Sequence, residues 1–302
     1  MGSLPRRAAL VLSVTAAFAP GACSGHPSPE RAVRVTLDIA YARRGERTLR
    51  LDLARPAVAP PAPLVVLLHG GGWEGGSRAS LRSEMEALAR LGYAAATVEY
   101  RLTERGRNLF PAAIADARCA VRFLRANAAR LGIDGARIGA AGYSAGAHLA
   151  SLLGTAATEA ALDEPCGDPA LEDVDPRVQA VISHAGPQDL RVRGPYTAEQ
   201  ARLVTNFLGV FPGDDPARAA LASPLAHVSP GDAPMLLVAG TRDDLVPVDH
   251  ARWMADALRE VGVEVTVLER RGAGHEFAGF VTGDREVRAA VLRLLERELQ
   301  RR

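Results

Sequence analysis

The sequence contains no lysine, because all 36 of its basic residues are arginines. A chain without lysine forms no lysine Schiff base and uses no lysine as a general base, so both kinds of chemistry are excluded. Its 35 acidic residues leave a formal net charge of +1, without the basic excess typical of nucleic-acid-binding proteins. Aromatic residues make up only 5%, but hydrophobic residues reach 48%, enough for one large core. A length of 302 residues fits a single α/β domain.

The chain also lacks an N-terminal hydrophobic run long enough to predict a transmembrane helix. Instead, Arg6 and Arg7 precede the apolar segment Ala8–Ala19, which is typical of a signal peptide. Cys23 follows small residues, as at a bacterial lipoprotein processing site, although Pro20 stands where leucine is usual. We expect residues 1–23 to direct export, residues 24–31 to form a flexible tether, and lipidated Cys23 to attach the protein to a membrane. Plain secretion and a start assigned too early remain open.

Cysteine is scarce, with three residues and no C-x-x-C motif. Histidines show no paired spacing either, so we expect no bound metal. If Cys23 carries lipid, Cys119 and Cys166 are left as an even pair in an exported protein. One disulfide between them is therefore expected, and two free thiols are the alternative.

A nucleophile motif lies in the middle of the chain. Residues Gly142–Gly146 read G-Y-S-A-G, which matches the G-x-S-x-G elbow that exposes a reactive serine between a strand and a helix. The apolar run Ala136–Ala141 precedes the motif, and the small-residue segment Ala145–Leu153 follows it as a helix start. Ser144 is therefore predicted to be a catalytic nucleophile.

A glycine-rich turn precedes this elbow in the chain. Residues His69–Trp73 read H-G-G-G-W and follow the apolar run Leu64–Leu68. Such a turn supplies backbone N–H groups to an oxyanion hole, where glycine lets the backbone approach the charge. We predict that the N–H groups of Gly71, Gly72 and Ala145 hold the oxyanion.

An acid and a base follow the elbow. The segment Gly240–Pro247 carries the adjacent Asp243 and Asp244, and Gly272–His275 ends on a histidine. The chain order serine, aspartate, histidine is the order of α/β-hydrolases, so we predict His275 as the base. Composition alone does not choose between the two aspartates.

Together these motifs resemble the serine esterases of the α/β-hydrolase superfamily, nearest to the bacterial feruloyl and acetyl-xylan esterase-like branch related to the hormone-sensitive-lipase group. The resemblance runs from about Thr36 to the C-terminus, with Ala147 and Ala239 as minor departures. In the family, the acid stands three residues before a Val-Pro pair. That pattern implies Asp243 as the acid and leaves Asp244 exposed or capping a helix. Further matching segments are Tyr100–Leu102, Phe110–Asp116, Val121–Ala128, Gly186–Leu190 and Ser223–Pro224.

Alternating apolar strands and helical segments predict an α/β-hydrolase fold over residues 32–302: a mostly parallel, doubly wound sheet of eight strands with a leading antiparallel hairpin. Expected helices include Arg78–Leu91, Phe110–Leu131 and Asp284–Leu299. An insertion at about 187–222 is expected to form short helices over an otherwise open site, with Tyr196, Phe207 and Phe211 as candidate cleft residues. The expected strands are Val33–Ala40, Thr48–Leu53, Leu64–Leu68, Tyr93–Val98, Arg137–Ala141, Val178–Ser183, Met235–Ala239 and Val263–Leu268.

The expected function is hydrolysis of short-acyl or aryl carboxylic esters, small or carbohydrate-linked, through an acyl-enzyme on Ser144 and without a cofactor. Because H-G-G-x-W also fits an arylformamidase, hydrolysis of an amide by the same triad is the alternative. A non-catalytic binding protein is disfavoured by the intact Ser144, Asp243 and His275. No nucleic-acid partner is expected. The acyl group, the alcohol and the oligomeric state do not follow from the sequence.

Overall fold

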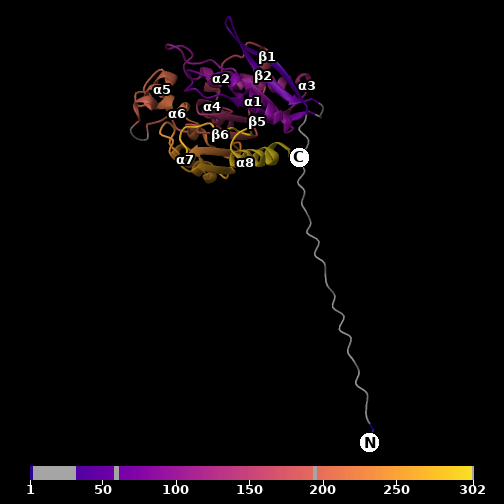
Figure 1. The fold of residues 1–302 in the computed structure, drawn as a ribbon. Coiled ribbons are helices and arrows are strands. Elements are labelled where there is room, and N and C mark those ends of the chain that lie inside the picture. The colour runs from indigo at the N-terminus through magenta and orange to yellow at the C-terminus, as the bar shows by residue number, and fades with distance from the viewer. Residues whose placement is uncertain (3–31, 58–60, 193–195, 301–302) are drawn as a thin grey trace. The chain divides into compact units, whose positions relative to one another are not determined.

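Eight strands form one sheet in the order β1-β2-β4-β3-β5-β6-β7-β8 (Figure 1). The computed structural model describes residues 1–2, 32–57, 61–192 and 196–300. Strand β2 pairs antiparallel with β1 and β4, and the other neighbours are parallel, which confirms the predicted leading hairpin and doubly wound sheet. The strands are β1 Val33–Arg44, β2 Arg47–Pro56, β3 Ala62–Leu68, β4 Ala94–Val98, β5 Ile133–Tyr143, β6 Ala180–His184, β7 Met235–Gly240 and β8 Val265–Arg270.

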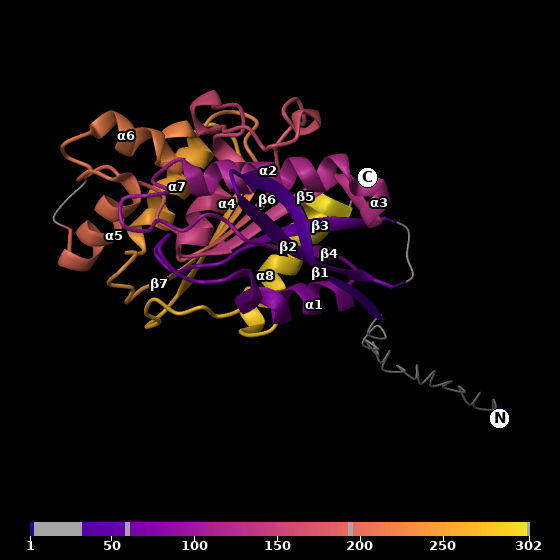
Figure 2. The ribbon, with the colours of Figure 1, turned by 90° about the horizontal axis from the view of Figure 1, so that it is seen from above.

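Helices cover both faces of this sheet (Figure 2). Side chains of α2, α4 and α7 pack on one face with Leu64, Val66 and Leu68 of β3, and side chains of α1 and α8 pack on the other with Val65 and Leu67. This alternation along β3 explains why a strand buried on both faces reads as one continuous apolar run. The α-helices are α1 Arg82–Arg90, α2 Ala112–Ala126, α3 Ala128–Leu131, α4 Ala145–Thr155, α5 Ala198–Leu208, α6 Pro216–Leu221, α7 Asp249–Glu260 and α8 Arg285–Leu295.

The expectation of one helix over Phe110–Leu131 is wrong, because Asn127 divides it into α2 and α3. The Asn127 side chain donates to the carbonyl of Phe123 at 2.9 Å, and its backbone leaves helical geometry. Asparagine competes with the helix by such local hydrogen bonds. The predicted stop at Gly132 is correct, since this residue caps α3 at a φ of 68°.

Two other helix ends differ in kind from the expectation. The turn Arg78–Leu81 is a 3₁₀ helix, so α1 begins at Arg82. After α8, residues Glu296–Gln300 continue as a π turn. Three further 3₁₀ helices lie at Ala160–Leu162, Pro169–Leu171 and Pro224–His227.

Short helices form in the predicted insertion. A capping box between Thr197 and Gln200 starts α5, and Asp215 with Pro216 starts α6. Both views show α5 and α6 beside each other, on the side of the molecule away from α3 (Figures 1 and 2).

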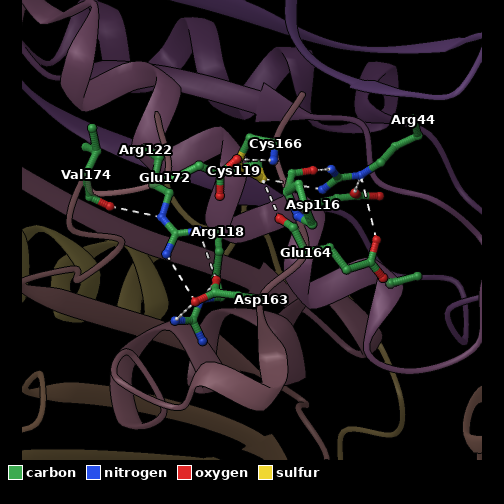
Figure 3. The surroundings of a disulfide bond; sticks show 12 residues. Arg44, Asp116, Arg118, Cys119, Arg122, Asp163, Glu164, Cys166, Glu172 and Val174 are labelled. Atoms are coloured by element: carbon green, nitrogen blue, oxygen red, sulfur yellow. Dashed lines mark hydrogen bonds and ion pairs between the residues drawn. A yellow bond between two sulfur atoms is a disulfide. The ribbon is translucent and has the colours of Figure 1, made fainter. Parts of the chain in front are cut away.

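A disulfide joins Cys119 of α2 to Cys166 in the loop between α4 and β6, with Cα atoms 5.5 Å apart (Figure 3). Asp163, in the same loop, accepts from Arg118 and Arg122, both from α2. The loop is therefore fastened to α2 by a covalent bond and by paired charges. We call α2 with residues 157–178 the disulfide flank.

A second group of charges surrounds Asp116 of the disulfide flank. Its side chain is fully buried and binds Arg44 at 2.8 Å and Arg101 at 2.8 Å. Glu164 binds Arg101 from the other side at 2.7 Å. Each buried charge is thus paired, as burial requires.

The expected signal peptide, the tether and Cys23 fall within residues 3–31, outside the described residues. Residues Arg31–Arg302 form one compact unit. Among the described residues, no helix is both long enough and apolar enough to cross a membrane.

Candidate active site

Ser144 occupies a sharp turn between β5 and α4. Its backbone adopts φ 55° and ψ −121°, which an L-residue rarely adopts. A Cβ on Gly142 would lie 2.1 Å from the carbonyl oxygen of Gly146, and one on Gly146 would lie 2.1 Å from that of Leu68. Both glycines of the motif are therefore sterically required by the turn that carries Ser144.

Three side chains from separate loops form a continuous chain of hydrogen bonds. His275 Nε2 lies 2.9 Å from Ser144 Oγ, and His275 Nδ1 lies 2.7 Å from Asp243 Oδ2. A carboxylate only accepts, so the proton of neutral His275 belongs on Nδ1 and Nε2 accepts from the serine. The structure thus brings together the predicted nucleophile, acid and base.

Backbone groups orient the carboxylate of Asp243. Its Oδ1 atom accepts from the N–H groups of Leu245 at 3.0 Å and Val246 at 2.7 Å, and its side chain is fully buried. The neighbouring Asp244 is exposed. The side chain that contacts His275 is therefore the one that the Val-Pro spacing indicates.

The glycine turn lies beside the nucleophile. Gly72 and Ala145 line the same cavity as Ser144, whereas Gly71 is not among the described residues of its wall. The carbonyl of Gly71 instead accepts from the N–H groups of Glu74 and Gly75, at 3.1 Å and 2.9 Å. Gly71 has a φ of 123° and Gly72 a φ of 59°, so the turn depends on glycine.

The buried side chains of His69 and Tyr100 hold this turn. Their rings stack at 4.3 Å, and the Tyr100 hydroxyl donates to the carbonyl of His69 at 2.7 Å. His69 Nδ1 lies 2.8 Å from the carbonyl oxygen of Gly70. Burial lowers the pKa of His69, which keeps the ring neutral. His69 thus holds the turn through its ring and its carbonyl.

A second buried histidine supports the turn from the elbow helix. His148 Nδ1 accepts from the indole N–H of Trp73 at 3.3 Å, and its Nε2 donates to the carbonyl of Ala222 at 2.7 Å. Burial lowers the pKa of His148 to about 4. The neutral ring therefore links the glycine turn to the end of the insertion.

A cavity of about 280 Å³ opens beside Ser144. Of the three expected aromatic residues, only Tyr196 lines it. Phe207 is buried and stacks on Trp73 at 4.3 Å, and Phe211 is partly exposed away from the wall. Phe207 is therefore a packing residue, whereas the ring of Phe211 lies 6.4 Å from that of Tyr196 without lining the described wall.

Sequence reasoning missed the part of the cavity wall that α7 contributes, namely Asp249, His250 and Trp253. His250 Nδ1 accepts from the N–H groups of Gln188 and Asp189, at 3.2 Å and 3.3 Å. The available signal was position, since α7 begins directly after the acid loop and its first turn must lie near Asp243.

Helix α5 connects the glycine turn to the acid loop. The Gln200 side chain donates to the carbonyls of Asp244 and Leu245, each at 3.1 Å. One turn later, Leu203 packs so closely on Gly72 that a Cβ there would lie 2.6 Å from its methyl group. Arg202 binds Glu74 at 2.8 Å. The insertion therefore contacts two of the segments that form the site.

Metal ligands do not gather in the described part of the chain: no three His, Cys, Asp or Glu side chains are grouped as a metal site requires.

A family model described as BD-FAE matches residues 51–258, more than half of the chain. The chain belongs to the BD-FAE family. This matched range includes Ser144 and Asp243 and ends before His275. The described structure of this BD-FAE chain has the α/β-hydrolase fold, which agrees with the predicted resemblance.

Two curated relatives of this BD-FAE chain are esterases of Mycobacterium tuberculosis. The chain is 34% identical to the esterase LipC over 235 residues, 75% of this chain and 56% of LipC. It is 32% identical to the esterase LipQ over 262 residues, 83% of this chain and 59% of LipQ. The chain thus spans less than two thirds of the length of either relative.

Solved structures show the same fold. An esterase of Thermogutta terrifontis, Est2, superposes with a TM-score of 0.70 at 29% identity, covering 89% of this BD-FAE chain and 91% of that chain. A truncated carbohydrate esterase from gut microbiota gives a TM-score of 0.77 at 22% identity, covering 91% and 99% of the two chains. The second likeness concerns the fold alone.

Proposed function

We propose that the protein is a serine carboxylic-ester hydrolase that uses Ser144, His275 and Asp243 as a catalytic triad. The observation that carries this proposal is the unbroken chain of contacts from Ser144 Oγ through His275 to the buried Asp243, beside a cavity. Relatives named as esterases support the same reaction class.

The reaction follows from the positions of the protons. Ser144 Oγ attacks the ester carbonyl while His275 Nε2 takes its proton, and Asp243 stabilises the imidazolium through Nδ1. The oxyanion forms beside the N–H groups of Gly72 and Ala145, which line the cavity, with the N–H of Gly71 as the third proposed donor. Loss of one such donor typically costs about 2.7–4 kcal/mol. His275 then protonates the leaving alcohol, and water releases the acid from the acyl-enzyme.

Short-acyl or aryl esters are the proposed substrates, either free or linked to carbohydrate. The cavity of about 280 Å³ is small for a long acyl chain. Est2 structures are described with propionate and with butyrate bound. A compact acyl group beside Ser144 fits both observations.

A substrate panel tests the activity. Wild type and Ser144→Ala are assayed on p-nitrophenyl acetate, butyrate and dodecanoate, a feruloyl ester, acetylated xylan and N-formylkynurenine. We expect the short p-nitrophenyl esters to be cleaved faster than dodecanoate, and Ser144→Ala to lose about 10⁴-fold or more of turnover. Preference for dodecanoate would refute the cavity argument. Preference for N-formylkynurenine would assign the triad to an arylformamidase instead.

We also propose that the protein is exported and anchored to a membrane by lipid on Cys23. Arg6-Arg7, the apolar segment and Cys23 support this proposal. Mass spectrometry of the mature N-terminus is expected to find a lipid-modified Cys23. A soluble product beginning downstream of Cys23 would favour plain secretion.

A further inference from the structure

Tyr143 stands immediately before the nucleophile, at the variable position of the G-x-S-x-G motif. Its hydroxyl donates to the backbone carbonyl of His275 at 3.0 Å. Its ring lies 5.3 Å from the His275 ring and 5.1 Å from that of Phe277. One side chain on the elbow strand thus contacts the loop that carries the base.

The same ring also packs against the glycine turn. A Cβ on Gly70 would lie 2.8 Å from Tyr143 Cδ1, so that residue's lack of a side chain allows the close approach. Tyr143 therefore lies on the elbow and contacts two further segments of the candidate site, the glycine turn and the loop of His275.

Tyr143 makes these contacts outside the described wall of the cavity. Its side chain is half-buried. A substrate in the cavity is therefore not expected to contact its side chain. Burial, followed by the nearby Asp243 carboxylate, raises the pKa of Tyr143 to about 12, so the hydroxyl remains a donor through the working range of an esterase.

We propose that Tyr143 is a positioning residue that fixes the distance between His275 and Ser144 by holding the carbonyl of His275. This inference rests on the proposed esterase function. His275 belongs to the loop after β8, whereas Ser144 follows β5, and β6 and β7 lie between those strands in the sheet. The hydroxyl of Tyr143 bridges this separation at the residue whose imidazole must lie within hydrogen-bond reach of Oγ.

Other contacts also hold this loop, including those of Glu276 and Phe277 with the buried His184 of β6. The carbonyl of Ala273 accepts from the N–H of Arg242 at 2.9 Å, and Glu84 accepts from the N–H of Val281 at 2.8 Å. Loss of the Tyr143 hydroxyl should therefore leave the loop attached but release the carbonyl of His275. Small misplacements of a catalytic group cost rate rather than fold.

The test compares Tyr143→Phe, which removes only the hydroxyl, with Tyr41→Phe and Ser144→Ala. Tyr41 is a buried tyrosine whose hydroxyl also bonds a backbone carbonyl, that of Glu99, so it is a matched control. For each variant, kcat and KM on p-nitrophenyl butyrate, the melting temperature and the NMR signal of the His275 Nδ1 proton are measured.

We expect Tyr143→Phe to lower kcat about tenfold, with KM within about twofold of wild type. The Nδ1 proton signal should broaden or shift, because the His275–Asp243 contact loosens. Tyr41→Phe should lower the melting temperature without changing kcat or that proton signal. Tyr143→Leu, which also removes the ring beside Gly70, should lower kcat further than Tyr143→Phe.

The two proposals fail in different ways. A kcat of Tyr143→Phe within twofold of wild type, or a rise in KM alone, would overturn the positioning role while Ser144→Ala is inactive. An unchanged Nδ1 signal would overturn it as well. Retained turnover in Ser144→Ala would instead overturn the esterase mechanism itself.

Discussion

The candidate active site and the disulfide flank differ in how many contacts hold each of them together. In the candidate site, each side-chain contact of His275 is made once: its ring contacts one carboxylate, that of Asp243, and one hydroxyl, that of Ser144. In the flank, contacts are duplicated, since Asp163 binds two arginines of α2 and a disulfide joins the same two segments. Activity should therefore fail with one substitution, whereas the flank should lose stability and keep its chemistry.

The two regions also differ in charge. Arginine–carboxylate pairs lie in the flank, whereas the buried rings of His148 and His184 lie beside the candidate site. His148 contacts Trp73 of the glycine turn, and His184, at the end of β6, lies 5.7 Å from the ring of Tyr143. Burial lowers the pKa of each of these histidines to about 4. A fall in pH should therefore destabilise the folded protein by favouring protonation of these two rings.

The strongest test of single contacts is the acid of the triad. Asp243→Asn should cut kcat about 10⁴-fold, because the amide favours the wrong tautomer of His275. Asp244→Asn changes an exposed neighbour of identical chemistry and should alter kcat less than tenfold. Steady-state kinetics of both variants decide the matter, and the reverse ranking would transfer the acid role to Asp244.

In the flank, the disulfide should govern stability without affecting chemistry. Replacing Cys119 and Cys166 together with serine opens a loop of 47 residues, for which chain entropy gives at most about 4 kcal/mol of unfolding free energy. Urea unfolding should detect the loss, while kcat of the folded variant stays within twofold of wild type. A matching fall in kcat would show that the flank and the site are coupled.

Acid should destabilise the protein through His148. Its folded pKa of about 4 lies below the unfolded value of about 6.5, so the unfolded state binds the proton first. Stability is therefore complete above about pH 6.5 and falls as pH approaches 4, by about 2 kcal/mol at pH 5 for this residue. Urea unfolding at pH 8 and pH 5 measures it. His148→Gln should flatten the curve; an unchanged slope would exclude His148 as the source.

The smallest effect is expected where α5 contacts the acid loop. At a partly exposed position, Gln200→Ala removes two bonds to the carbonyls of Asp244 and Leu245 and the capping-box bond from the N–H of Thr197. We expect kcat/KM to fall about two- to fivefold with little change in melting temperature. Glu199→Gln, on the same helix but fully exposed, is the control. Equal effects from both variants would indicate a general disturbance of α5.

The sequence predicted the parts of the site that local chemistry determines. Gly142 and Gly146 are required by one turn, and the order of Ser144, Asp243 and His275 follows from the fold, so motifs locate them. The central strands were found because a buried strand is apolar along its length, and the leading hairpin was found from its alternating apolar and polar residues. Several strand ends lie a few residues from the predicted positions.

What the sequence did not predict depends on packing between distant segments. Phe207 does not line the cavity because it stacks on Trp73, which lies more than a hundred residues earlier in the chain. His250 and Trp253 reach the cavity only because of how α7 is oriented. The break between α2 and α3 depends on a single hydrogen bond from the Asn127 side chain to the carbonyl of Phe123.

The backbone conformation that presents the Ser144 side chain to the cavity is expected to lower the stability of the folded protein. A non-glycine residue held at a φ of 55° in this region typically carries about 1–3 kcal/mol of strain. Ser144→Ala retains the strain and Ser144→Gly releases it, while both remove the same hydroxyl. After the entropy that glycine adds to the unfolded chain, the glycine variant should be the more stable by about 1 kcal/mol. The strained backbone would thus favour glycine at this position, and only the proposed reaction accounts for a serine there.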